Sequence, residues 1–343
     1  MRIGIVNDLS LAREALRRIV AESPSHEVAW TANDGSAAIE CARRDPPDLI
    51  LMDLFMPRVD GVEATRKIMS ERPCAILIVT ATVAGHLSKV YEAMGHGALD
   101  AVDTPILGGK KDNSRVLLQK INTIGLLVGK VSSTLDTSSS GIAPAALGDI
   151  RHPLILLGSS TGGPSALAEI LGHFPTDWTA ATVIVQHVDA TFAPGLASWL
   201  GERAGHSVSL VTSGAAPEPG RIYLAGTNDH VILNRNGRFG ETPDPAELSY
   251  RPSVDVFFRS ARRHWPRPGV AALLTGMGRD GASGLLDLRR HGWHTIAQEP
   301  TTCVVAGMPR AAIELDAAMK ILPLTRIGPA IVDFVRALPQ TRT

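Results

Sequence analysis

With 343 residues, the chain is long enough for about two domains of ordinary size, and 44% of its residues are hydrophobic, as in a globular protein. Its 34 Lys and Arg residues balance its 34 Asp and Glu residues, which argues against sequence-independent binding to nucleic acid. We find neither an apolar segment of the roughly 18 residues that span a bilayer nor a signal peptide, so we expect a cytoplasmic protein without membrane insertion.

The first part of the chain alternates short apolar segments with segments of helical periodicity. The predicted strands are residues 3–6, 28–32, 49–52, 75–79 and 98–102, and the predicted helices are residues 11–21, 36–43, 61–70 and 86–94. Strands and helices that alternate at this spacing form a parallel sheet with helices on both faces. We therefore predict a doubly wound, flavodoxin-like α/β domain over residues 1–125.

The composition changes over residues 126–150, which we predict to be an interdomain linker. Three serines at residues 138–140 are followed by glycine and then by Pro144, a composition typical of flexible connections. A new apolar strand at residues 154–157 opens a second α/β domain, predicted over residues 151–338 as another doubly wound parallel sheet. Its other predicted strands are residues 181–185, 221–225, 231–233 and 270–274.

Polar side chains follow most of the strands predicted in the first domain. These residues are Asn7, Asp8, Asp53, Thr80 and Thr104. Ligands of a doubly wound sheet bind outside the carboxyl ends of its strands, where these side chains converge. Two carboxylates and a carbonyl there suit Mg²⁺, which takes oxygen ligands, and a carboxylate beside such a cation can attack a phosphoryl donor. The Thr80 hydroxyl would then hydrogen-bond the new phosphoryl group.

Several motifs of the first domain point to one family. They are Val6-Asn7-Asp8, Leu51-Met52-Asp53-Leu54-Phe55-Met56-Pro57, Asp60-Gly61 and Thr80-Ala81. Over most of the domain they resemble the receiver domain of response regulators. The resemblance implies that Asp53 is the phosphoacceptor and that Thr80 is the switch hydroxyl. It also implies a Mg²⁺ site formed by Asp8, Asp53 and the Phe55 carbonyl.

Three positions depart from the receiver pattern. Asn7 stands where the family usually has the first of two acidic residues. Thr104 takes a switch position that usually holds a lysine, which removes a positive donor to the phosphoryl group. Ala101 takes the place of the usual switch aromatic. We therefore expect phosphorylation at Asp53 with a weak conformational switch through Thr80 and Thr104.

A glycine-rich turn follows the first strand of the second domain at residues 158–164, and a helical pattern begins at residue 165. A strand, a tight turn and a helix start surround one point with backbone N–H groups. Such a turn either cradles a phosphate or raises a serine nucleophile beside an oxyanion hole. The dinucleotide fingerprint G-x-G-x-x-G is absent, but the turn alone does not decide between the two interpretations.

Two further strands of the second domain also end in polar residues. His187 follows the strand at residues 181–185, and Asp280 lies in the turn after residues 270–274. Together with a serine of the glycine-rich turn, they reach the same edge of one parallel sheet. A nucleophile, a base and a carboxylate that orients the base can assemble there. Each residue taken singly fits an ordinary loop position, so the triad hypothesis depends on their combination.

Separated motifs of the second domain agree in order with one family. They are Gly158-Ser159-Ser160-Thr161-Gly162-Gly163, Gln186-His187, Arg251-Pro252-Ser253-Val254-Asp255, Leu274-Thr275-Gly276-Met277-Gly278-Arg279-Asp280-Gly281-Ala282 and Gly307-Met308-Pro309. The domain resembles the catalytic domain of the chemotaxis-type protein-glutamate methylesterases, the CheB family. The resemblance implies Ser160 as nucleophile, His187 as general base and Asp280 as its orienting carboxylate. It also implies an oxyanion hole from the backbone amides of Thr161 and Met277, and no cofactor for ester hydrolysis.

The order of receiver, linker and esterase resembles that family from end to end. It implies a phosphorylation-regulated enzyme that hydrolyses γ-glutamyl methyl esters on methyl-accepting chemoreceptors and releases methanol. Some members also deamidate receptor glutamine to glutamate. A chemotaxis-type histidine kinase would be the phosphodonor. The variant receiver motifs at Asn7 and Thr104 further resemble the branch that serves the Wsp surface-sensing pathway.

Two other functions remain open at the level of the sequence. A transcriptional response regulator needs a basic recognition helix, which the neutral, hydrolase-like second domain does not offer. A non-catalytic scaffold or phosphate sink of a chemosensory array would keep the fold without the chemistry. The set of Ser160, His187 and Asp280 argues against a scaffold, and methanol release from methylated receptors would separate the two.

Overall fold

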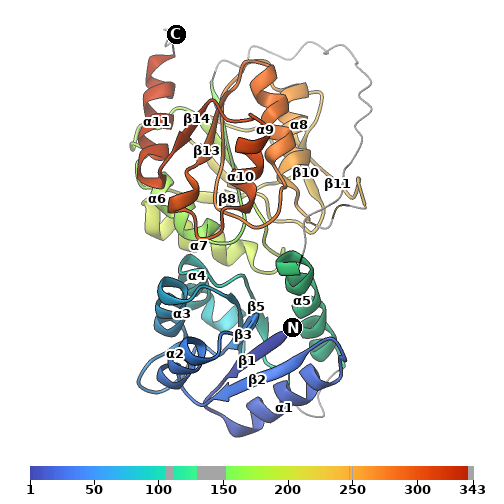
Figure 1. Cartoon of the computed structure of the whole chain (residues 1–343). Helices are drawn as coiled ribbons and strands as arrows, with labels where there is room; N and C mark the ends of the chain where they lie inside the picture. Colours follow the sequence, from blue (N-terminus) through green and yellow to red (C-terminus); the bar gives the residue numbers. More distant parts are fainter. Residues whose placement is uncertain (106–110, 130–151, 247, 249, 339–343) are drawn as a thin grey trace. The chain divides into compact units, whose positions relative to one another are not determined.

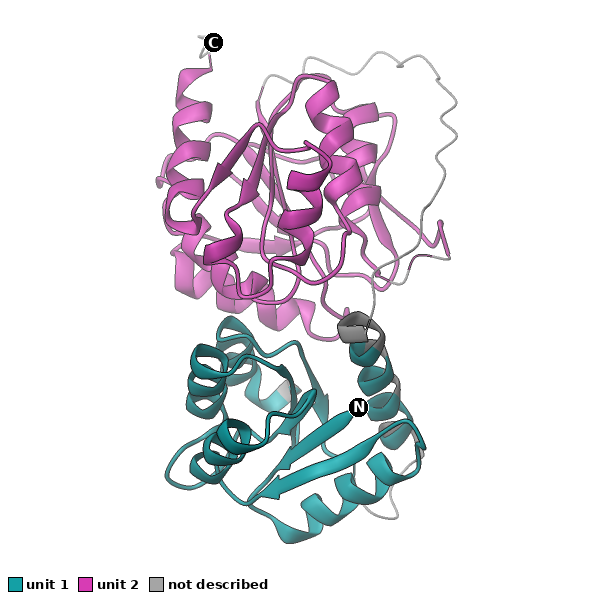
Figure 2. Ribbon diagram, viewed as in Figure 1, with its two compact units in different colours: residues 1–133 teal, residues 134–343 magenta. Residues whose placement is uncertain are grey.

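The computed structural model describes residues 1–105, 111–129, 152–246, 248 and 250–338. The chain divides into two compact units, Met1–Ser133 and Thr134–Thr343, each of which is described by itself (Figure 2). The predicted linker at residues 126–150 lies outside the described residues from residue 130 onward, and residues 126–129 continue a helix. The domain boundaries given by the sequence therefore stay predictions.

A five-stranded parallel sheet forms the centre of the first unit (Figure 1). Its strands are β1 (Arg2–Val6), β2 (Glu27–Ala32), β3 (Leu49–Met52), β4 (Ala75–Thr80) and β5 (Asp100–Asp103). The spatial order β2-β1-β3-β4-β5 is that of the flavodoxin-like fold, so the predicted fold class is confirmed. The order reverses between β1 and β3, where Val6 pairs with Met52, and ligands bind at such switch points.

Helices cover both faces of this sheet (Figure 1). They are α1 (Ser10–Ala21), α2 (Gly35–Arg44), α3 (Gly61–Glu71), α4 (Leu87–Gly95) and α5 (Lys111–Gly129), with a 3-10 helix at Ala84–His86. Asp34 and Asp60 cap α2 and α3, because their side chains accept hydrogen bonds from amides of the first helical turn. Leu16 of α1 and Ile121 of α5 belong to one buried cluster with Leu49 of the sheet, which forms the core of this face.

A seven-stranded parallel sheet forms the centre of the second unit. Its strands, in spatial order, are β14 (Lys320–Leu322), β13 (His294–Gln298), β12 (Val270–Leu273), β6 (Leu154–Ser159), β7 (Ala181–Gln186), β9 (Ile222–Leu224) and β8 (Val208–Leu210). The predicted doubly wound parallel sheet is therefore confirmed here too. The strand order reverses between β6 and β12, which pair directly, so a ligand crevice is expected at their carboxyl ends.

The helices of the second unit pack in two groups. The first group is α6 (Gly163–Leu171), α7 (Ala193–Ala204) and α11 (Leu324–Ala337), and the second is α8 (Val254–His264), α9 (Ala282–Arg290) and α10 (Gly307–Glu314). Helix α8 places Val254, Phe257, Phe258 and Ala261 on one face, at the spacing of an amphipathic helix. These residues are fully buried in a cluster with Leu156 of the sheet, which holds the helix against it.

Some strands of the second unit differ from the sequence-based expectation. The strand predicted at residues 231–233 is β10 (His230–Leu233), which pairs antiparallel with β11 (Phe239–Thr242) in a separate two-stranded sheet. Strands β8, β11, β13 and β14 have no counterpart among the predicted strands, because each is short or has polar ends. In β13, only three residues lie between the polar residues His294 and Gln298, so the sequence shows no clear apolar strand. The segment becomes a strand because it pairs with β12 and β14.

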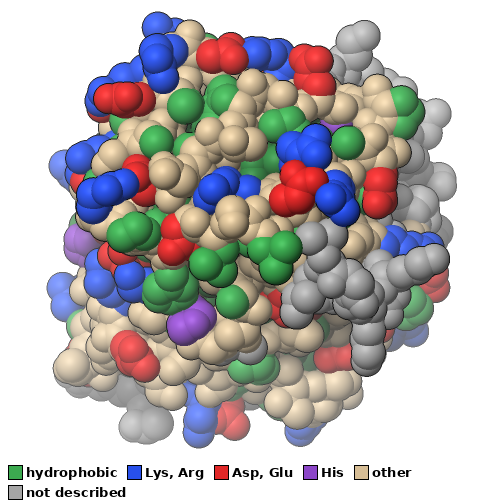
Figure 3. Space-filling view, turned by 90° about the horizontal axis from the view of Figure 1, so that it is seen from below, with side chains coloured by type: hydrophobic (Ala, Val, Ile, Leu, Met, Phe, Trp, Pro, Cys, Tyr) green, Lys and Arg blue, Asp and Glu red, His purple; other side chains and the backbone are tan. Residues whose placement is uncertain are grey.

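The surface carries charges of both signs. In the space-filling view of Figure 3, Lys and Arg side chains are interspersed with Asp and Glu side chains over the visible face. Several of these charges form ion pairs in the first unit, for example Arg17 with Glu14 and Arg43 with Glu71. Among the helices that the structure describes, none has both the length and the hydropathy needed to cross a membrane.

Candidate active site

The predicted phosphorylation site lies at the carboxyl edge of the first sheet. Asp53 follows β3 and is 8% exposed, and its Oδ2 accepts a 2.8 Å hydrogen bond from Asn7 Nδ2. Asp8 follows Asn7 and is exposed. Because an ionised acidic side chain has no proton to donate, only a residue such as asparagine can orient the Asp53 carboxylate in this way.

The oxygen atoms at this edge suit a hard cation. Burial raises the pKa of the Asp53 carboxyl to about 6, and the charge of Asp8 adds to the increase. A divalent cation near both carboxylates would neutralise this charge, and Mg²⁺ prefers carboxylate and carbonyl oxygens. Among the described residues, no three His, Cys, Asp or Glu side chains converge on a metal site. Mg²⁺ usually keeps several water ligands and binds through only one or two carboxylates, so the two carboxylates at this edge are compatible with the predicted site.

The two predicted switch residues end neighbouring strands. Thr80 is the last residue of β4, and its carbonyl accepts a 2.8 Å hydrogen bond from the N–H of Thr104, just after β5. The Thr80 hydroxyl is buried and has no hydrogen-bond partner among the described residues. Ala101, in the place of the usual aromatic, is buried within β5. The free Thr80 hydroxyl is thus available to a group bound at Asp53.

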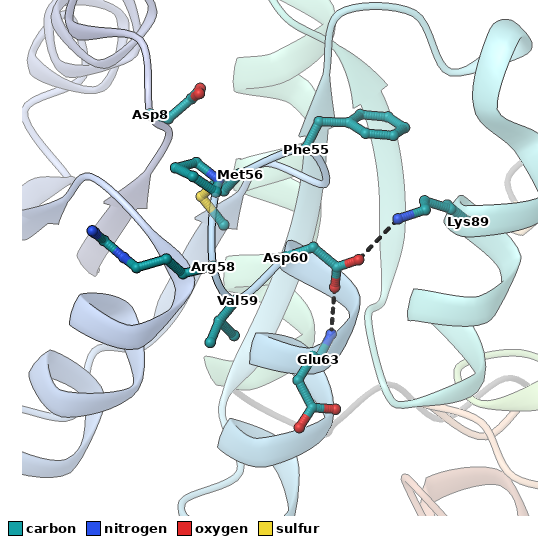
Figure 4. Close-up of a pocket in the computed structure, with 9 residues that line it drawn as sticks. Asp8, Phe55, Met56, Arg58, Val59, Asp60, Glu63 and Lys89 are labelled. Atoms are coloured by element: carbon teal, nitrogen blue, oxygen red, sulfur yellow. Dashed lines mark hydrogen bonds and ion pairs between the residues drawn. The ribbon is translucent and has the colours of Figure 1, made fainter.

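A pocket borders the same edge, and Asp8 and Phe55 line it together with Asp60 and Lys89 (Figure 4). Figure 4 shows the Lys89 ammonium group directed at the Asp60 carboxylate, 2.8 Å away. Lys89 also lies 5.2 Å from the centre of the Phe55 ring. The lysine of this pocket therefore comes from α4 and is held by Asp60, whereas the position after β5 holds Thr104.

The glycine-rich turn of the second unit joins β6 to α6 at the switch point. Ser160 directly follows β6, and its N–H donates to the Thr275 carbonyl at 3.1 Å, which ties the ends of β6 and β12 together. Gly162 has a φ of 77°, a left-handed conformation that glycine adopts without strain. A Cβ on Gly276 would lie 2.8 Å from the Ser160 Cβ, so glycine permits this close approach.

His187 directly follows the neighbouring strand β7. Ser159 pairs with Gln186 in the parallel register, and the His187 N–H donates to the Ser159 carbonyl at 3.1 Å. Ser160 and His187 therefore occupy corresponding positions at the ends of strands about 4.8 Å apart. Among the described residues His187 Nδ1 has no hydrogen-bond partner, so no hydrogen bond joins it to the Ser160 side chain.

The imidazole of His187 is hydrogen-bonded to Asp280. The distance from His187 Nε2 to Asp280 Oδ2 is 2.7 Å, and each side chain is only 9% exposed. Because an ionised carboxylate can only accept, the proton lies on Nε2 and the lone pair on Nδ1. Nδ1 is buried and has no partner in the part of the chain that the structure describes. This nitrogen is therefore free to accept a proton.

The start of helix α8 holds the charge of Asp280. The Asp280 carboxylate accepts hydrogen bonds from Ser253 Oγ at 2.8 Å, from the Val254 N–H at 2.7 Å and from the Asp255 N–H at 3.1 Å. Burial alone would raise the pKa of Asp280, but the hydrogen bond from His187 and those from the backbone amides keep it below its usual value. Helix N-termini stabilise anions, so Asp280 stays ionised and orients the imidazole.

Gln186 joins the two strand ends that carry Ser160 and His187. Its Nε2 donates to the Ser160 carbonyl at 2.9 Å and to the His187 carbonyl at 3.2 Å, while its Oε1 accepts from Ser159 Oγ at 2.6 Å. The side chain is 1% exposed. The sequence assigns no role to Gln186, although a polar residue at the end of an apolar strand was a usable signal.

The predicted oxyanion donors, the backbone amides of Thr161 and Met277, belong to the turns that follow β6 and β12. Thr161 follows Ser160 in the chain, and Met277 follows Gly276, which contacts Ser160. Within the described residues, neither amide N–H donates to a protein acceptor. Amides without an acceptor are the donors that an oxyanion hole uses, so the prediction for Thr161 and Met277 stays open to test.

Two residues near the site had no role assigned from the sequence. Ser253 donates to Asp280, and Tyr250 stacks on the His187 ring. Both lie in or directly before the motif at residues 251–255, which was the only signal for them. His230, by contrast, is fully buried, and its Nδ1 accepts from the Ser253 N–H at 3.1 Å, so it supports the start of α8.

Comparisons with known proteins cover both units. The family described as "CheB methylesterase" matches residues 155–331, and the family described as "Response regulator receiver domain" matches residues 3–110. The crystal structure of the Thermotoga maritima CheB methylesterase catalytic domain is similar with a TM-score of 0.51 and 32% sequence identity. The match covers 54% of this chain and 99% of that one.

Curated relatives match over nearly the whole chain. The protein-glutamate methylesterase/protein-glutamine glutaminase 2 of Burkholderia orbicola is 52% identical over 339 residues, which are 98% of this chain and 100% of the relative. The protein-glutamate methylesterase/protein-glutamine glutaminase of group 3 operon of Pseudomonas putida is 50% identical over 336 residues, 97% of this chain and 99% of the relative. The chain therefore belongs to the CheB family and carries its receiver and methylesterase domains in that order.

Proposed function

We propose that the protein is a phosphorylation-regulated protein-glutamate methylesterase that hydrolyses γ-glutamyl methyl esters on methyl-accepting chemoreceptors and releases methanol. The observation that carries the proposal is the 2.7 Å hydrogen bond between His187 Nε2 and Asp280 at the strand ends beside Ser160. It leaves Nδ1 of His187 as a buried base without a partner among the described residues. The activity in the names of the full-length relatives supports the same reaction.

The first half of the reaction acylates Ser160. Ser160 Oγ attacks the ester carbonyl while His187 Nδ1 takes the hydroxyl proton, and Asp280 stabilises the resulting imidazolium. The carbonyl oxygen becomes an oxyanion, which the free amides of Thr161 and Met277 stabilise. The carbon–oxygen bond to the methoxy group then breaks, His187 returns its proton to that oxygen, and methanol leaves.

The second half of the reaction releases the product. A water molecule attacks the acyl carbonyl while His187 Nδ1 takes its proton, and the same two amides stabilise the second oxyanion. Breaking the bond to Ser160 Oγ, with return of the proton to that oxygen, regenerates the serine and leaves a glutamate carboxylate. With a glutamine substrate the same steps release ammonia in place of methanol, which supports the deamidase activity named for the relatives.

The receiver unit would control this activity through phosphorylation of Asp53 by a chemotaxis-type histidine kinase. Bound Mg²⁺, held by Asp8, Asp53 and the Phe55 carbonyl, would neutralise the charge of the phosphoryl group during transfer. The free Thr80 hydroxyl would donate to the phosphoryl oxygens. Both a receptor substrate and a kinase donor favour the cytoplasm as the compartment in which the protein acts.

Methanol release from membranes that contain a methylated receptor tests the proposal. We expect Ser160→Ala and His187→Ala each to lose activity by about three orders of magnitude or more, and the double variant to be little worse than either, because triad members act as a unit. Ser165→Ala, an exposed serine of α6, is the matched control and should leave the rate unchanged.

Equally slow release by the wild type and by Ser160→Ala would favour the non-catalytic scaffold. Receptors from a surface-sensing array and from a motility array, compared in the same assay, would identify the pathway. The receiver variants Asn7 and Thr104 favour the Wsp surface-sensing array as the better substrate.

A further inference from the structure

Tyr250 lies flat against the imidazole of His187. The two ring centroids are 4.4 Å apart, and the ring planes differ by only 3°. The Nε2 atom of the same imidazole is fixed by Asp280 at 2.7 Å. An edge contact and a face contact together leave the imidazole ring little freedom to tilt or rotate. The phenol ring also covers one face of the base and keeps water from it.

The hydroxyl of Tyr250 has no hydrogen-bond partner among the residues that the structure describes. Its oxygen is buried. Burial, together with the nearby charge of Asp280, raises the pKa of Tyr250 to about 12, so the hydroxyl keeps its proton and remains a donor. Buried polar atoms without a partner are rare in proteins, and each one calls for an explanation such as a bound ligand.

The hydroxyl lies beside the turn that carries one of the two free amides. A Cβ on Gly278 would lie 3.4 Å from the Tyr250 hydroxyl oxygen, and Gly278 directly follows Met277. The phenol therefore reaches from the face of the base to the turn of the proposed oxyanion hole. A peptide whose ester carbonyl sits at Ser160 would pass within reach of this hydroxyl.

We propose that Tyr250 is a substrate-binding and positioning residue of the esterase site: its hydroxyl donates a hydrogen bond to an acceptor oxygen of the receptor polypeptide, and its ring holds the His187 imidazole in place. The inference rests on the proposed function and adds to it a contact with the substrate outside the triad. It also separates two contributions, because the hydroxyl acts on binding and the ring acts on the base.

Two substitutions separate these contributions. Tyr250→Phe removes only the hydroxyl, and we expect KM for the methylated receptor to rise by about threefold to tenfold while kcat stays unchanged. Tyr250→Leu removes the ring as well, and we expect kcat to fall by about tenfold. A small activated ester, p-nitrophenyl acetate, has no polypeptide to bind. Tyr250→Phe should therefore hydrolyse it at the wild-type rate, whereas Tyr250→Leu should hydrolyse it more slowly than the wild type.

Tyr223→Phe is the matched control, because Tyr223 is a tyrosine of the same unit whose hydroxyl accepts a 3.2 Å hydrogen bond from the Glu218 N–H. It should leave kcat and KM unchanged on both substrates. An unchanged KM of Tyr250→Phe for the receptor would overturn the proposal, even if Tyr250→Leu failed to fold. Loss of activity in Ser160→Ala, measured in parallel, shows whether the proposed function itself holds.

Discussion

Two largely buried carboxyl groups, those of Asp255 and Asp280, lie next to each other at the start of helix α8 and have opposite pKa shifts. The backbone N–H of Asp255 donates to Asp280, and the Asp255 side chain accepts from the Gly284 N–H at 2.5 Å. Burial and the charge of Asp280 raise the pKa of Asp255 to about 7. Hydrogen bonds to Asp280 from His187 and from backbone amides keep its pKa below the usual value. The charge at this point is therefore concentrated on the carboxylate that orients the base.

Asp255→Asn should change how stability depends on pH. In the unfolded chain Asp255 loses its proton near its usual value of 3.8, and in the folded protein only near 7, so its contribution to the free energy of unfolding is lost as pH rises between these values. The variant lacks this loss and keeps an oxygen for the Gly284 N–H. Relative to that of the wild type, the free energy of unfolding of the variant should rise by on the order of 2 kcal/mol between about pH 5 and pH 7. Urea denaturation at both values measures the gain, and a constant difference would contradict the assigned shift.

Gln186→Leu should weaken both activity and stability. The substitution leaves the carbonyls of Ser160 and His187 and the hydroxyl of Ser159 without the partner that Gln186 provides. We expect a loss of about 1–3 kcal/mol in the free energy of unfolding and a lower kcat in the methanol-release assay. Thr295→Val is the control: Thr295 is equally buried but accepts a hydrogen bond from Met319 near the amino end of β13. A comparable fall in kcat for both variants would assign the effect to general loosening of the fold.

At the scale of elements, strand ends and helix starts place the functional groups. Strands β6, β7 and β12 deliver Ser160, His187 and the turn with Asp280 to one edge, because parallel strands all end on the same side. Helix α8 then supplies donors to Asp280, since the first amides of a helix have no acceptor within it. The same arrangement recurs in the first unit, where β1 and β3 deliver Asn7 and Asp53.

Ser253→Ala should remove two contributions of one side chain, the cap of helix α8 and the hydrogen bond to Asp280. Ser253 Oγ accepts from the Val256 N–H at 3.3 Å as the cap and donates to Asp280 at 2.8 Å. We expect a loss of about 0.5–2 kcal/mol in stability, as for other helix caps, together with a lower kcat. Ser260→Ala in the same helix removes a buried hydroxyl that hydrogen-bonds Leu233 and Phe257. It should cost stability without lowering kcat, and equal kcat values for the two variants would contradict the link to Asp280.

At the scale of the whole molecule, each unit has its own core and its own site at a carboxyl edge. One buried cluster includes Ile3, Leu49 and Leu117, and the other includes Leu156 and Phe257. The two units are therefore complete folds, each with a separate chemical task. Their connection is functional: phosphorylation in one unit would change the rate of hydrolysis in the other.

A small-molecule phosphodonor with Mg²⁺ should label Asp53 and raise methanol release by the full chain. Coupling between sites of 1–3 kcal/mol corresponds to about 5–150-fold, and we expect about fivefold here, because Thr104 and Ala101 replace the lysine and the aromatic of the usual switch. Asp53→Asn should lose both labelling and stimulation while keeping the unstimulated rate. Chelation of Mg²⁺ should also prevent labelling. Stimulation that persists in Asp53→Asn would place the phosphoacceptor elsewhere.

The sequence by itself determined the class of both folds and the candidate residues at the two edges. Apolar segments that alternate with helical periodicity predict parallel sheets, and the polar residues that follow those segments, such as Asp53 and His187, must lie at the carboxyl edge. These are local signals, because a strand, its end and the residue after it are adjacent in the chain. The family motifs added the roles that we propose for Ser160 and Asp280.

Only the tertiary structure decided which side chains meet. His187 and Asp280 are 93 positions apart, and the support that Asp280 receives from Ser253 spans 27 positions, so neither contact is visible in a local pattern. The stacking of Tyr250 on His187 was missed for the same reason. Contacts of this kind depend on how sheets and helices pack over long distances in the chain, whereas the periodicity of a sequence reports only which face of each element is buried.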